Sequence, residues 1–405
     1  MPRTALILTP RLPWPLDDGG RIASWQMVWS AAQAYDVTLL SLVPSGTESE
    51  PLPPALASLG IRVERVPHRP PGPASAAARG LFGPWPYTLG RYRNRALAAR
   101  LRERIVERAP AYVLAGPLHM ATYEGDARGV PFVIRQHNVE HVWMERWART
   151  LGATPAGLYA RVQAARLKRA EARLCRAAAL TLAVHEEDAA ALRALAPGAR
   201  VVALPVAADL DRFPPPRPVV PPVVLLAGSF LWRPNVEGAL RFLAEGWPRV
   251  RGRVPAARLR IAGKGPPPAL VSAAKAAGAE VARDVPSMPE EFAAASVLVV
   301  PLWVGAGARV KVVEAMAARL PVVATPLACE GLALAPGVHY LDGAAASDLG
   351  DRVSELLSDA GRREALARAA RALAEERWSL PRIARLQNEL VARIAAPEGG
   401  SPAGG

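Results

Sequence analysis

Residues 301–326 read PLWVGAGARVKVVEAMAARLPVVATP. The apolar run just before them, Ser296–Val300, predicts a buried strand, and Val322–Ala324 predicts a second one. Between these strands, Gly305-Ala306-Gly307 predicts a tight turn and Arg309–Arg319 a short helix. A glycine turn that leads from a strand into a helix lets backbone N–H groups approach an anion closely. The stretch therefore predicts an α/β sheet with an anion site at the end of a strand.

Charged side chains follow this turn. Arg309 and Lys311 add positive charge, and Glu314 lies about one and a half turns into the helix, within reach of neutral hydroxyls beside the anion. This pattern predicts a phosphate and a sugar held side by side. The alternative is a packing loop before an ordinary amphipathic helix, with Val310 in the core and Glu314 in solvent.

A proline-rich segment divides the chain. Residues 213–222 read FPPPRPVVPP, which excludes helix and central strand and is typical of a semi-rigid linker. Strands alternate with helices on both sides of it, so we expect two doubly wound, Rossmann-like α/β domains. The expected parts are an N-terminal domain over 1–212, a C-terminal domain over 223–380, a last helix over 381–396 that crosses back to the first domain, and a disordered tail over 397–405. In sheets of this kind ligands bind beyond the carboxyl ends of the strands, so two facing domains would form a substrate cleft.

Composition limits the classes of function. The 405 residues are 51% hydrophobic and carry a net charge of +14, most of it in the first half of the chain. This charge has two interpretations: attraction to an anionic membrane face or an acidic acceptor, or compositional drift with solvated helix faces. The basic helices expected over Asn94–Ala109 and Ala156–Ala177 could lie near a membrane that holds a lipid-linked acceptor; the alternative is that their apolar faces pack on the core. No aromatic-and-basic motif indicates nucleic-acid binding.

The cysteines and the apolar runs bear on location. Cys175 and Cys329 have no metal-ligand spacing and form no disulfide framework, which fits a reducing cytoplasm. The apolar run near the N-terminus is short for a signal peptide, and no run approaches the ~20 residues of a membrane span. We expect a cytoplasmic protein, with peripheral contact at the inner membrane face left open.

Several segments together resemble glycosyltransferase family 4, whose members have the two-domain GT-B fold. VGAGARVKVVEAMAARLPVVATPLACEGL resembles the family's donor-site signature, and VVLLAGSFLWRPNVEGALRFL, LRIAGKGPP and DVPSMPEEFAAASVLVVPLWVGAG resemble the segments before it. In the first half, ILTPRLPWPLDDGGRIAS resembles the family's N-terminal glycine loop, RQHNVEHVWMERWA its His-Asn segment and LAVHEEDAAALRAL its last helix before the linker. The resemblance covers the chain except for 67–90 and the tail.

The resemblance implies roles for residues of the C-terminal domain. Glu314 matches the second glutamate of a Glu-x7-Glu motif and would accept hydrogen bonds from the nucleotide ribose. The first glutamate would fall at Ala306, so this chain resembles the subgroup with a glycine-rich donor loop that lacks it. The diphosphate would lie on the backbone of Gly305, Ala306, Gly307, Ala308, Arg309 and Val310, with Lys311 and Arg309 at its oxygens. Arg233 lies in a loop where the family uses basic residues on the diphosphate; the alternative is a surface arginine, and we expect Asn235 to cap the next helix.

In the N-terminal domain the resemblance implies that the loop with Gly19 and Gly20 lies over the donor phosphate and the acceptor. His137, which follows a strand at its carboxyl end, would contact the donor sugar or the acceptor. A structural histidine is the alternative. Glu140 is expected in the first turn of the following helix, where a carboxylate is favourable. His185 and Glu186 are interpreted as helix caps.

These features predict a retaining, metal-independent glycosyltransferase without a cofactor. It would move a sugar from a UDP- or GDP-linked donor to a hydroxyl of a glycan, lipid-linked or small-molecule acceptor, in polysaccharide or glycoconjugate biosynthesis, with His137 and Glu314 as catalytic residues. No zinc spacing and no Asp-x-Asp dyad occurs in the sequence. Two alternatives stay open: an epimerase or hydrolase of nucleotide sugars on the same fold, and a non-catalytic scaffold.

Overall fold

The computed structural model describes residues 3–16, 18–214, 216–217, 219–304 and 309–395. Its contacts divide the chain into two compact units. Unit one comprises residues 1–15, 23–205 and 383–405, and unit two comprises residues 16–22 and 206–382. The contacts thus place the division at Pro205, whereas the sequence pattern placed it in the proline-rich segment 213–222.

Unit one is built on a parallel sheet of seven strands in the order β3-β2-β1-β4-β5-β6-β7 among the described residues. The strands are β1 (Thr4–Thr9), β2 (Asp36–Pro44), β3 (Arg62–His68), β4 (Tyr112–Ala115), β5 (Phe132–Arg135), β6 (Leu180–Ala183) and β7 (Val201–Ala203). The helices are α1 (Gly19–Ala32), α2 (Pro54–Ala57), α3 (Pro73–Phe82), α4 (Tyr87–Gly90), α5 (Arg95–Arg108), the 3-10 helix η1 (Leu118–Asp126), α6 (Glu140–Thr150), α7 (Pro155–Ala177) and α8 (Glu186–Leu195). The segment 67–90, expected as a loop with a hairpin or a short helix, contains the helices α3 and α4.

The last helix, α16 (Leu380–Ala395), belongs mostly to unit one and packs against α1. Gln387 Nε2 donates to the carbonyl of Met27 at 3.0 Å, and Asn388 Nδ2 donates to the carbonyl of Ser30 at 2.8 Å. Segments from both ends of the chain therefore complete this unit.

Unit two repeats the arrangement with six strands in the order β10-β9-β8-β11-β12-β13. The strands are β8 (Val223–Ala227), β9 (Arg258–Gly263), β10 (Glu280–Arg283), β11 (Val297–Val300), β12 (Val322–Ala324) and β13 (Leu341–Asp342). The helices are η2 (Leu210–Arg212), α9 (Arg233–Arg241), the π-helical turn η3 (Phe242–Gly246), α10 (Trp247–Arg253), α11 (Pro268–Ala276), α12 (Met288–Ala293), α13 (Val310–Ala317), η4 (Pro326–Cys329), α14 (Ala346–Ser358) and α15 (Ala360–Trp378).

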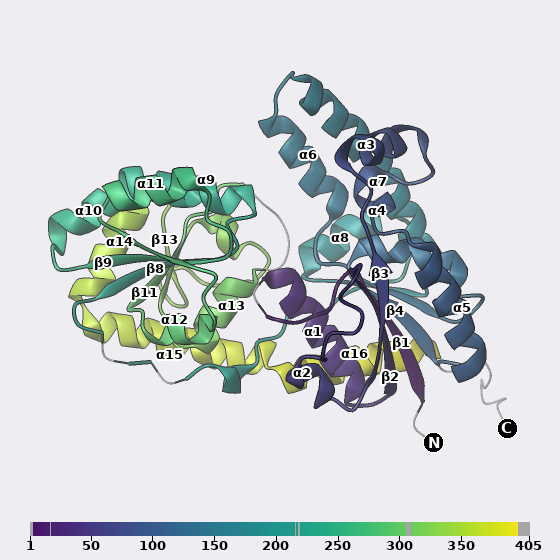
Figure 1. Cartoon of the computed structure of the whole chain (residues 1–405). Helices are drawn as coiled ribbons and strands as arrows, with labels where there is room; N and C mark the ends of the chain where they lie inside the picture. Colours follow the sequence, from purple (N-terminus) through teal and green to yellow (C-terminus); the bar gives the residue numbers. More distant parts are fainter. Residues whose placement is uncertain (1–2, 17, 215, 218, 305–308, 396–405) are drawn as a thin grey trace. The chain divides into compact units, whose positions relative to one another are not determined.

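Alternating side chains explain why both faces of the unit-two sheet are covered. Along β8, Val224 and Leu226 enter the core beneath α9, α10 and α14, whereas Leu225 and Ala227 enter the core beneath α12, α13 and α15. Figure 1 shows these two groups of helices on opposite faces of the sheet. β8 and β11 are apolar throughout, as strands buried on both faces are, whereas β9 and β10 carry charged residues. The prediction of two doubly wound α/β domains is confirmed.

In both sheets the order of strands reverses beside the first strand, between β1 and β4 and between β8 and β11. Loops leave such a point in opposite directions, which makes the carboxyl ends of these strands the usual ligand site. The turns after β1, β4, β5, β8, β9 and β11 are therefore where a site is sought.

Candidate functional site

Two glycines meet at the carboxyl ends of β8 and β9. Gly228 and Gly263 both have φ of +148°, a backbone conformation that residues other than glycine rarely adopt. A Cβ atom on Gly263 would lie 1.8 Å from the carbonyl oxygen of Gly228, so the two backbones are in contact. A Cβ on Gly228 would lie 2.8 Å from Lys311 Nζ. Glycine is therefore required for the contact between the two backbones, and the lack of a side chain at Gly228 leaves room for the amine of Lys311.

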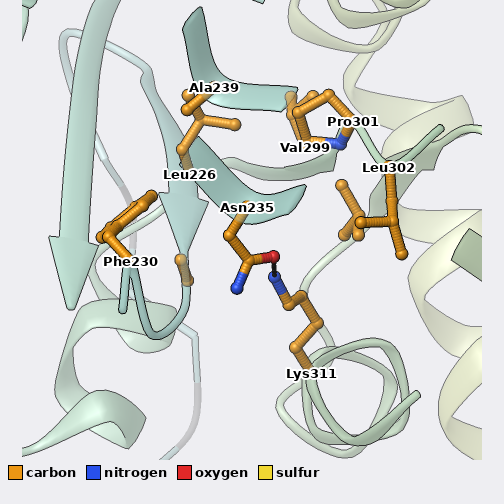
Figure 2. Close-up of a pocket in the computed structure, with 10 residues that line it drawn as sticks. Leu226, Phe230, Asn235, Ala239, Val299, Pro301, Leu302 and Lys311 are labelled. Atoms are coloured by element: carbon orange, nitrogen blue, oxygen red, sulfur yellow. Dashed lines mark hydrogen bonds between the residues drawn. The ribbon is translucent and has the colours of Figure 1, made fainter. Parts of the chain in front are cut away.

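Lys311 is held in place by the amide of Asn235. Its Nζ donates to Asn235 Oδ1 at 2.9 Å, and Asn235 Nδ2 donates to the carbonyl of Ser229 at 2.8 Å. Figure 2 shows the two side chains pointing toward each other from α9 and α13. They line a pocket at the strand ends, whose wall is formed by Leu226, Ala227, Phe230, Asn235, Ala239, Val299, Val300, Pro301, Leu302 and Lys311. A largely apolar pocket with one cation and one amide is suited to an anion that must be oriented.

The electrostatics at the start of α13 are those of two neighbouring cations. Burial, and then the charge of Arg309, lower the pKa of Lys311 to about 8. Arg309 is itself buried, and its Nη2 donates to Glu330 Oε2 at 3.3 Å. At neutral pH Lys311 is thus still mostly charged, and an arriving anion would relieve the repulsion between the two side chains.

Glu314 follows Lys311 by three residues and therefore shares its side of α13. The side chain is buried, and burial raises its pKa to about 7, against a smaller lowering by Arg212. Arg212 Nη1 lies 3.7 Å from Glu314 Oε1, which is an ion pair at long range. The expectation of a solvated Glu314, one of the two alternatives from the sequence, is wrong because α13 is buried on nearly all sides.

Several expected donor-site residues are placed elsewhere or not described. Gly305, Ala306, Gly307 and Ala308 lie outside the described residues. Arg233 is exposed on α9, and its Nε donates to Glu237 Oε1 at 2.6 Å. Asn235 was expected to cap the helix, but α9 begins at Arg233, so Asn235 stands in its first turn, where its side chain is free to reach Lys311 and Ser229.

The expected residues of the first half lie in two places. Gly19 and Gly20 begin α1, in the segment that groups with unit two, and a Cβ atom on Gly19 would lie 3.5 Å from Val310 Cγ2 at the start of α13. His137 follows β5 and is buried, and its pKa is lowered to about 3 by burial and by the charges of Arg135, His119 and Arg11. A neutral imidazole of this kind exchanges hydrogen bonds with hydroxyl groups rather than pairing with anions. His185 caps α8, as the sequence predicted, by accepting from the backbone N–H of Asp188 at 3.3 Å.

A buried carboxylate that sequence reasoning missed supports the His137 segment. Glu171, on α7, accepts from the backbone N–H groups of Glu140 at 3.0 Å and His141 at 3.2 Å, and its Oε2 lies 2.6 Å from His141 Nδ1. Its charge adds to burial in raising the pKa of Glu140 to about 7. Glu171 lies among basic residues on a helix for which the sequence left two alternatives, a membrane-facing element and a core-facing helix. The signal that would have found it is its position between Ala170 and Leu174 on the buried face.

Arg135 was also missed. It is buried and donates to the carbonyls of Ala183 at 3.1 Å, Leu204 at 2.6 Å and Pro205 at 3.1 Å, so it ties the ends of β6 and β7 to β5. Burial lowers its pKa to about 10. Arg135 lies directly before Gln136, His137 and Asn138, so its hydrogen bonds fix the backbone from which the His137 side chain extends.

Two searches of the described residues gave negative results. No group of three or more His, Cys, Asp or Glu side chains in the described part of the chain is arranged to hold a metal ion. None of the helices that the structure describes has the length and apolarity needed to cross a bilayer.

Comparison with solved structures shows the fold. A sucrose-phosphate synthase from Thermosynechococcus elongatus aligns with a TM-score of 0.72 and 15% identity, over 97% of this chain and 99% of that one. The Anabaena protein HepE, in complex with UDP and glucose, aligns with a TM-score of 0.66 and 15% identity, over 96% and 99%. The glycosyltransferase WaaG, involved in lipopolysaccharide biosynthesis, aligns with a TM-score of 0.65 and 16% identity, over 98% and 100%.

At the level of sequence the similarity is confined to the second half. Residues 221–375 match the family described as "Glycosyl transferases group 1". No curated protein matches the chain. The matched residues contain the pocket of Lys311 and Asn235, together with Glu314. The fold is that of the GT-B glycosyltransferases.

Proposed function

We propose that this protein is a glycosyltransferase whose unit two binds a UDP- or GDP-linked sugar. The observation that carries the proposal is the arrangement at the ends of β8, β9 and β11. There a half-buried lysine is fixed by Asn235 against Gly228, whose φ of +148° only glycine readily adopts. Neighbours of the same fold add support, because HepE has been crystallised with UDP-glucose.

In this proposal Lys311 and Arg309 bind the diphosphate. Both cations lie at the start of α13, where the helix dipole also favours negative charge. The proposed backbone contacts of Gly305, Ala306, Gly307, Ala308 and Val310 complete that cradle. As the bond from the anomeric carbon to the diphosphate breaks, negative charge grows on the leaving oxygen, and fixed cations stabilise it.

Glu314 is proposed to accept hydrogen bonds from ribose hydroxyls. Its pKa of about 7 means that about half of the side chains are ionised at neutral pH in the unliganded protein. Hydroxyl donors favour the ionised form, so nucleotide binding would release a fraction of a proton at pH 7.

His137 is proposed to serve the sugar or the acceptor as a neutral hydrogen-bonding group. The acceptor hydroxyl attacks the anomeric carbon and its proton leaves with the diphosphate or to solvent. Retention of the anomeric configuration and a role in polysaccharide or glycoconjugate assembly are part of the proposal, as are auxiliary contacts of Gly19, Gly20 and Arg233 with the donor. A cytoplasmic location and contact with the inner membrane face stay predictions.

The test is incubation with a panel of UDP- and GDP-sugars, with and without a pool of glycans and simple sugars, followed by mass spectrometry. Release of nucleotide diphosphate together with an acceptor heavier by one sugar residue is the expected result. A new isomer of the donor, or release without an acceptor, would replace the proposal with epimerisation or hydrolysis. Nothing with any donor, and no binding of UDP or GDP, would leave a scaffold. The same reactions in EDTA are expected to run at an unchanged rate, and a loss restored by Mg²⁺ or Mn²⁺ would refute metal independence.

A further inference from the structure

The outer side of α7 carries apolar side chains that the core of unit one does not cover. Leu158 and Val162 are 63% and 39% exposed, whereas Leu167 of the same helix lies in the core. Leu158, Val162 and Arg169 are spaced by four and then seven residues, so they share one side of the helix, away from the core-facing side. The apolar residues of α7 therefore form two sets, and one of them faces outward.

The helix α3 is fixed alongside this part of α7 (Figure 1). Tyr159 Oη donates to the carbonyl of Ala77 at 3.2 Å, and Gln163 Nε2 donates to the carbonyl of Gly80 at 3.0 Å. Each of these donors stands directly after one of the two exposed apolar residues of α7. Phe82, the last residue of α3, is 89% exposed. The end of α3 thus adds an exposed aromatic ring beside the apolar side chains of α7.

The surroundings of these apolar side chains are strongly basic. Residues 146–170 contain six arginines and lysines and no aspartate or glutamate, and residues 65–102, which include α3, contain eight arginines and no acid. Arg161, Lys168 and Arg169 are exposed on α7. The potential over this surface is therefore positive. We call the following residues the α7 outer surface: Phe82, Leu158, Arg161, Val162, Lys168 and Arg169.

The acids of α6 and α7 do little to oppose this charge. Glu140 and Glu171 are buried, and Glu171 accepts from backbone N–H groups at the start of α6. Glu145, which is half-buried, is the remaining acid of the two helices. The exposed charges of this pair of helices are thus mostly positive.

Exposed apolar side chains among basic ones fit the surface of a bilayer that contains anionic lipids. Apolar side chains of this kind enter the boundary between headgroups and acyl chains, and the stems of arginine and lysine lie along it while their charged ends reach the phosphates. A second copy of this chain would bring two basic faces together, and charges of the same sign repel. A soluble polyanion would pair with the basic residues but leave Phe82 and Leu158 in water.

We infer that the α7 outer surface binds the surface of a lipid bilayer that contains anionic lipids. The inference goes beyond the proposed function and does not rest on it, because lipid binding is measured without a nucleotide sugar. Binding of UDP and GDP is measured in every variant, so that failure of the donor site and failure of this surface are distinguishable.

Sedimentation of the full-length protein with vesicles is the first test. The vesicles are pure phosphatidylcholine, or phosphatidylcholine with about 30 mol% phosphatidylglycerol. We expect the anionic vesicles to bind the protein at least about tenfold more tightly, with a partition coefficient that falls as salt is added.

Substitutions then separate the two contributions. Phe82→Ser and Leu158→Ser should each lower the partition coefficient on anionic vesicles by about tenfold or more, because each removes an apolar group that enters the lipid. The double substitution Lys168→Gln and Arg169→Gln should lower it by about tenfold to thirtyfold, at about fivefold for each basic residue near an anionic surface.

Matched controls remove the same groups elsewhere. Val106→Ser acts on a side chain that is 74% exposed on α5, but Glu103 and Glu107 lie on the same helix. The double substitution Arg249→Gln and Arg251→Gln removes two exposed charges from α10 of unit two. Each control should change the partition coefficient by less than about twofold, since neither site belongs to the α7 outer surface.

A spectroscopic probe tests the location without removing charge. Cys175 and Cys329 are both buried, so a cysteine introduced by Leu158→Cys can be labelled selectively with an environment-sensitive fluorophore. Anionic vesicles should shift the emission of this label to the blue and raise its intensity, whereas a label introduced through Val106→Cys should not respond.

The following results would overturn the inference. One is equal binding to neutral and anionic vesicles, or no binding to either. Another is a loss in the Val106→Ser variant as large as that in the Leu158→Ser variant, or a response of the label at position 106 in place of position 158. Binding of dextran sulfate as tight as that of anionic vesicles, and unaffected by Phe82→Ser and Leu158→Ser, would assign the surface to a soluble polyanion instead.

Discussion

Replacement of Lys311 by methionine tests the donor site most directly. The side chain becomes one atom shorter and loses its charge, together with the hydrogen bond to Asn235 Oδ1. A hydrogen bond between charged groups contributes about 1.5–3 kcal/mol, so we expect the Kd of UDP or GDP to rise by about tenfold to 150-fold. The Kd of uridine or guanosine, which lack phosphate, should change by less than about threefold.

The pH dependence gives the same prediction an independent form. Because the pKa of Lys311 is about 8 in the unliganded protein, diphosphate affinity should fall as pH rises above 8, by up to tenfold per pH unit. The methionine variant has no such group and should show a flat profile over this range.

Isothermal titration calorimetry from pH 6 to 10 measures both effects. Lys275→Met, at an exposed position of α11, is the control for loss of one lysine charge. An equal effect on nucleoside and nucleotide, an unchanged pH profile, or an equal loss in the Lys275 variant would refute the assignment of Lys311 to the diphosphate.

Three further substitutions test the surroundings. Glu314→Gln should weaken nucleotide binding. The folded state raises the pKa of Glu314 from 4.5 to about 7, so the wild-type carboxyl favours folding below pH 4.5 and this advantage is lost as the pH rises to 7. In urea unfolding the variant should therefore be relatively more stable than the wild type above pH 7, by up to about 3 kcal/mol. Equal stability of the two proteins at pH 5 and pH 8 would contradict the raised pKa. Gly263→Ala should lower the free energy of unfolding by more than about 2 kcal/mol and reduce nucleotide binding, because its Cβ would meet the carbonyl of Gly228. The control is Gly252→Ala on α10, whose Cβ would meet nothing within 4 Å and which should be neutral or stabilising. Thermal melts of both variants measure the difference. Glu171→Gln should cost about 1–3 kcal/mol in urea unfolding, because an amide oxygen replaces a carboxylate that accepts two backbone N–H groups, and an unchanged midpoint would show that these bonds contribute little.

Much of the fold was predictable because strands buried on both faces leave long apolar runs that alternate with helical patterns. The runs at Val223–Ala227 and Ser296–Val300 are examples, and each lies within one residue of the observed strand. The start of α9 was missed since Pro234 can occupy the first turn of a helix, which moves the cap from Asn235 back to Trp232. The local sequence is compatible with a helix that begins at Arg233 and with one that begins after Asn235. The contact between Asn235 and Lys311 is a tertiary one, so the local sequence does not predict it.

The donor side of the site was partly predictable for a related reason. Lys311 and Glu314 lie in the same short helix, so their spacing alone places them together. Asn235, by contrast, is separated from Lys311 by 76 residues, and only the parallel pairing of β8 with β11 brings the two together. Glu171 is the extreme case: its position between Ala170 and Leu174 indicates the buried face of α7, but its role depends on the backbone of another helix.

The union of α1 and α16 in unit one has a consequence for biosynthesis. The carbonyls of Met27 and Ser30 receive their side-chain partners from Gln387 and Asn388, so a nascent polypeptide must expose that face of α1 until α16 has been synthesised. Unit two, whose strands lie between these segments, can reach its own hydrogen-bonded sheet earlier. A premature stop at residue 383 would therefore leave unit two intact and unit one without most of its final helix, a species that cellular proteases are well suited to remove.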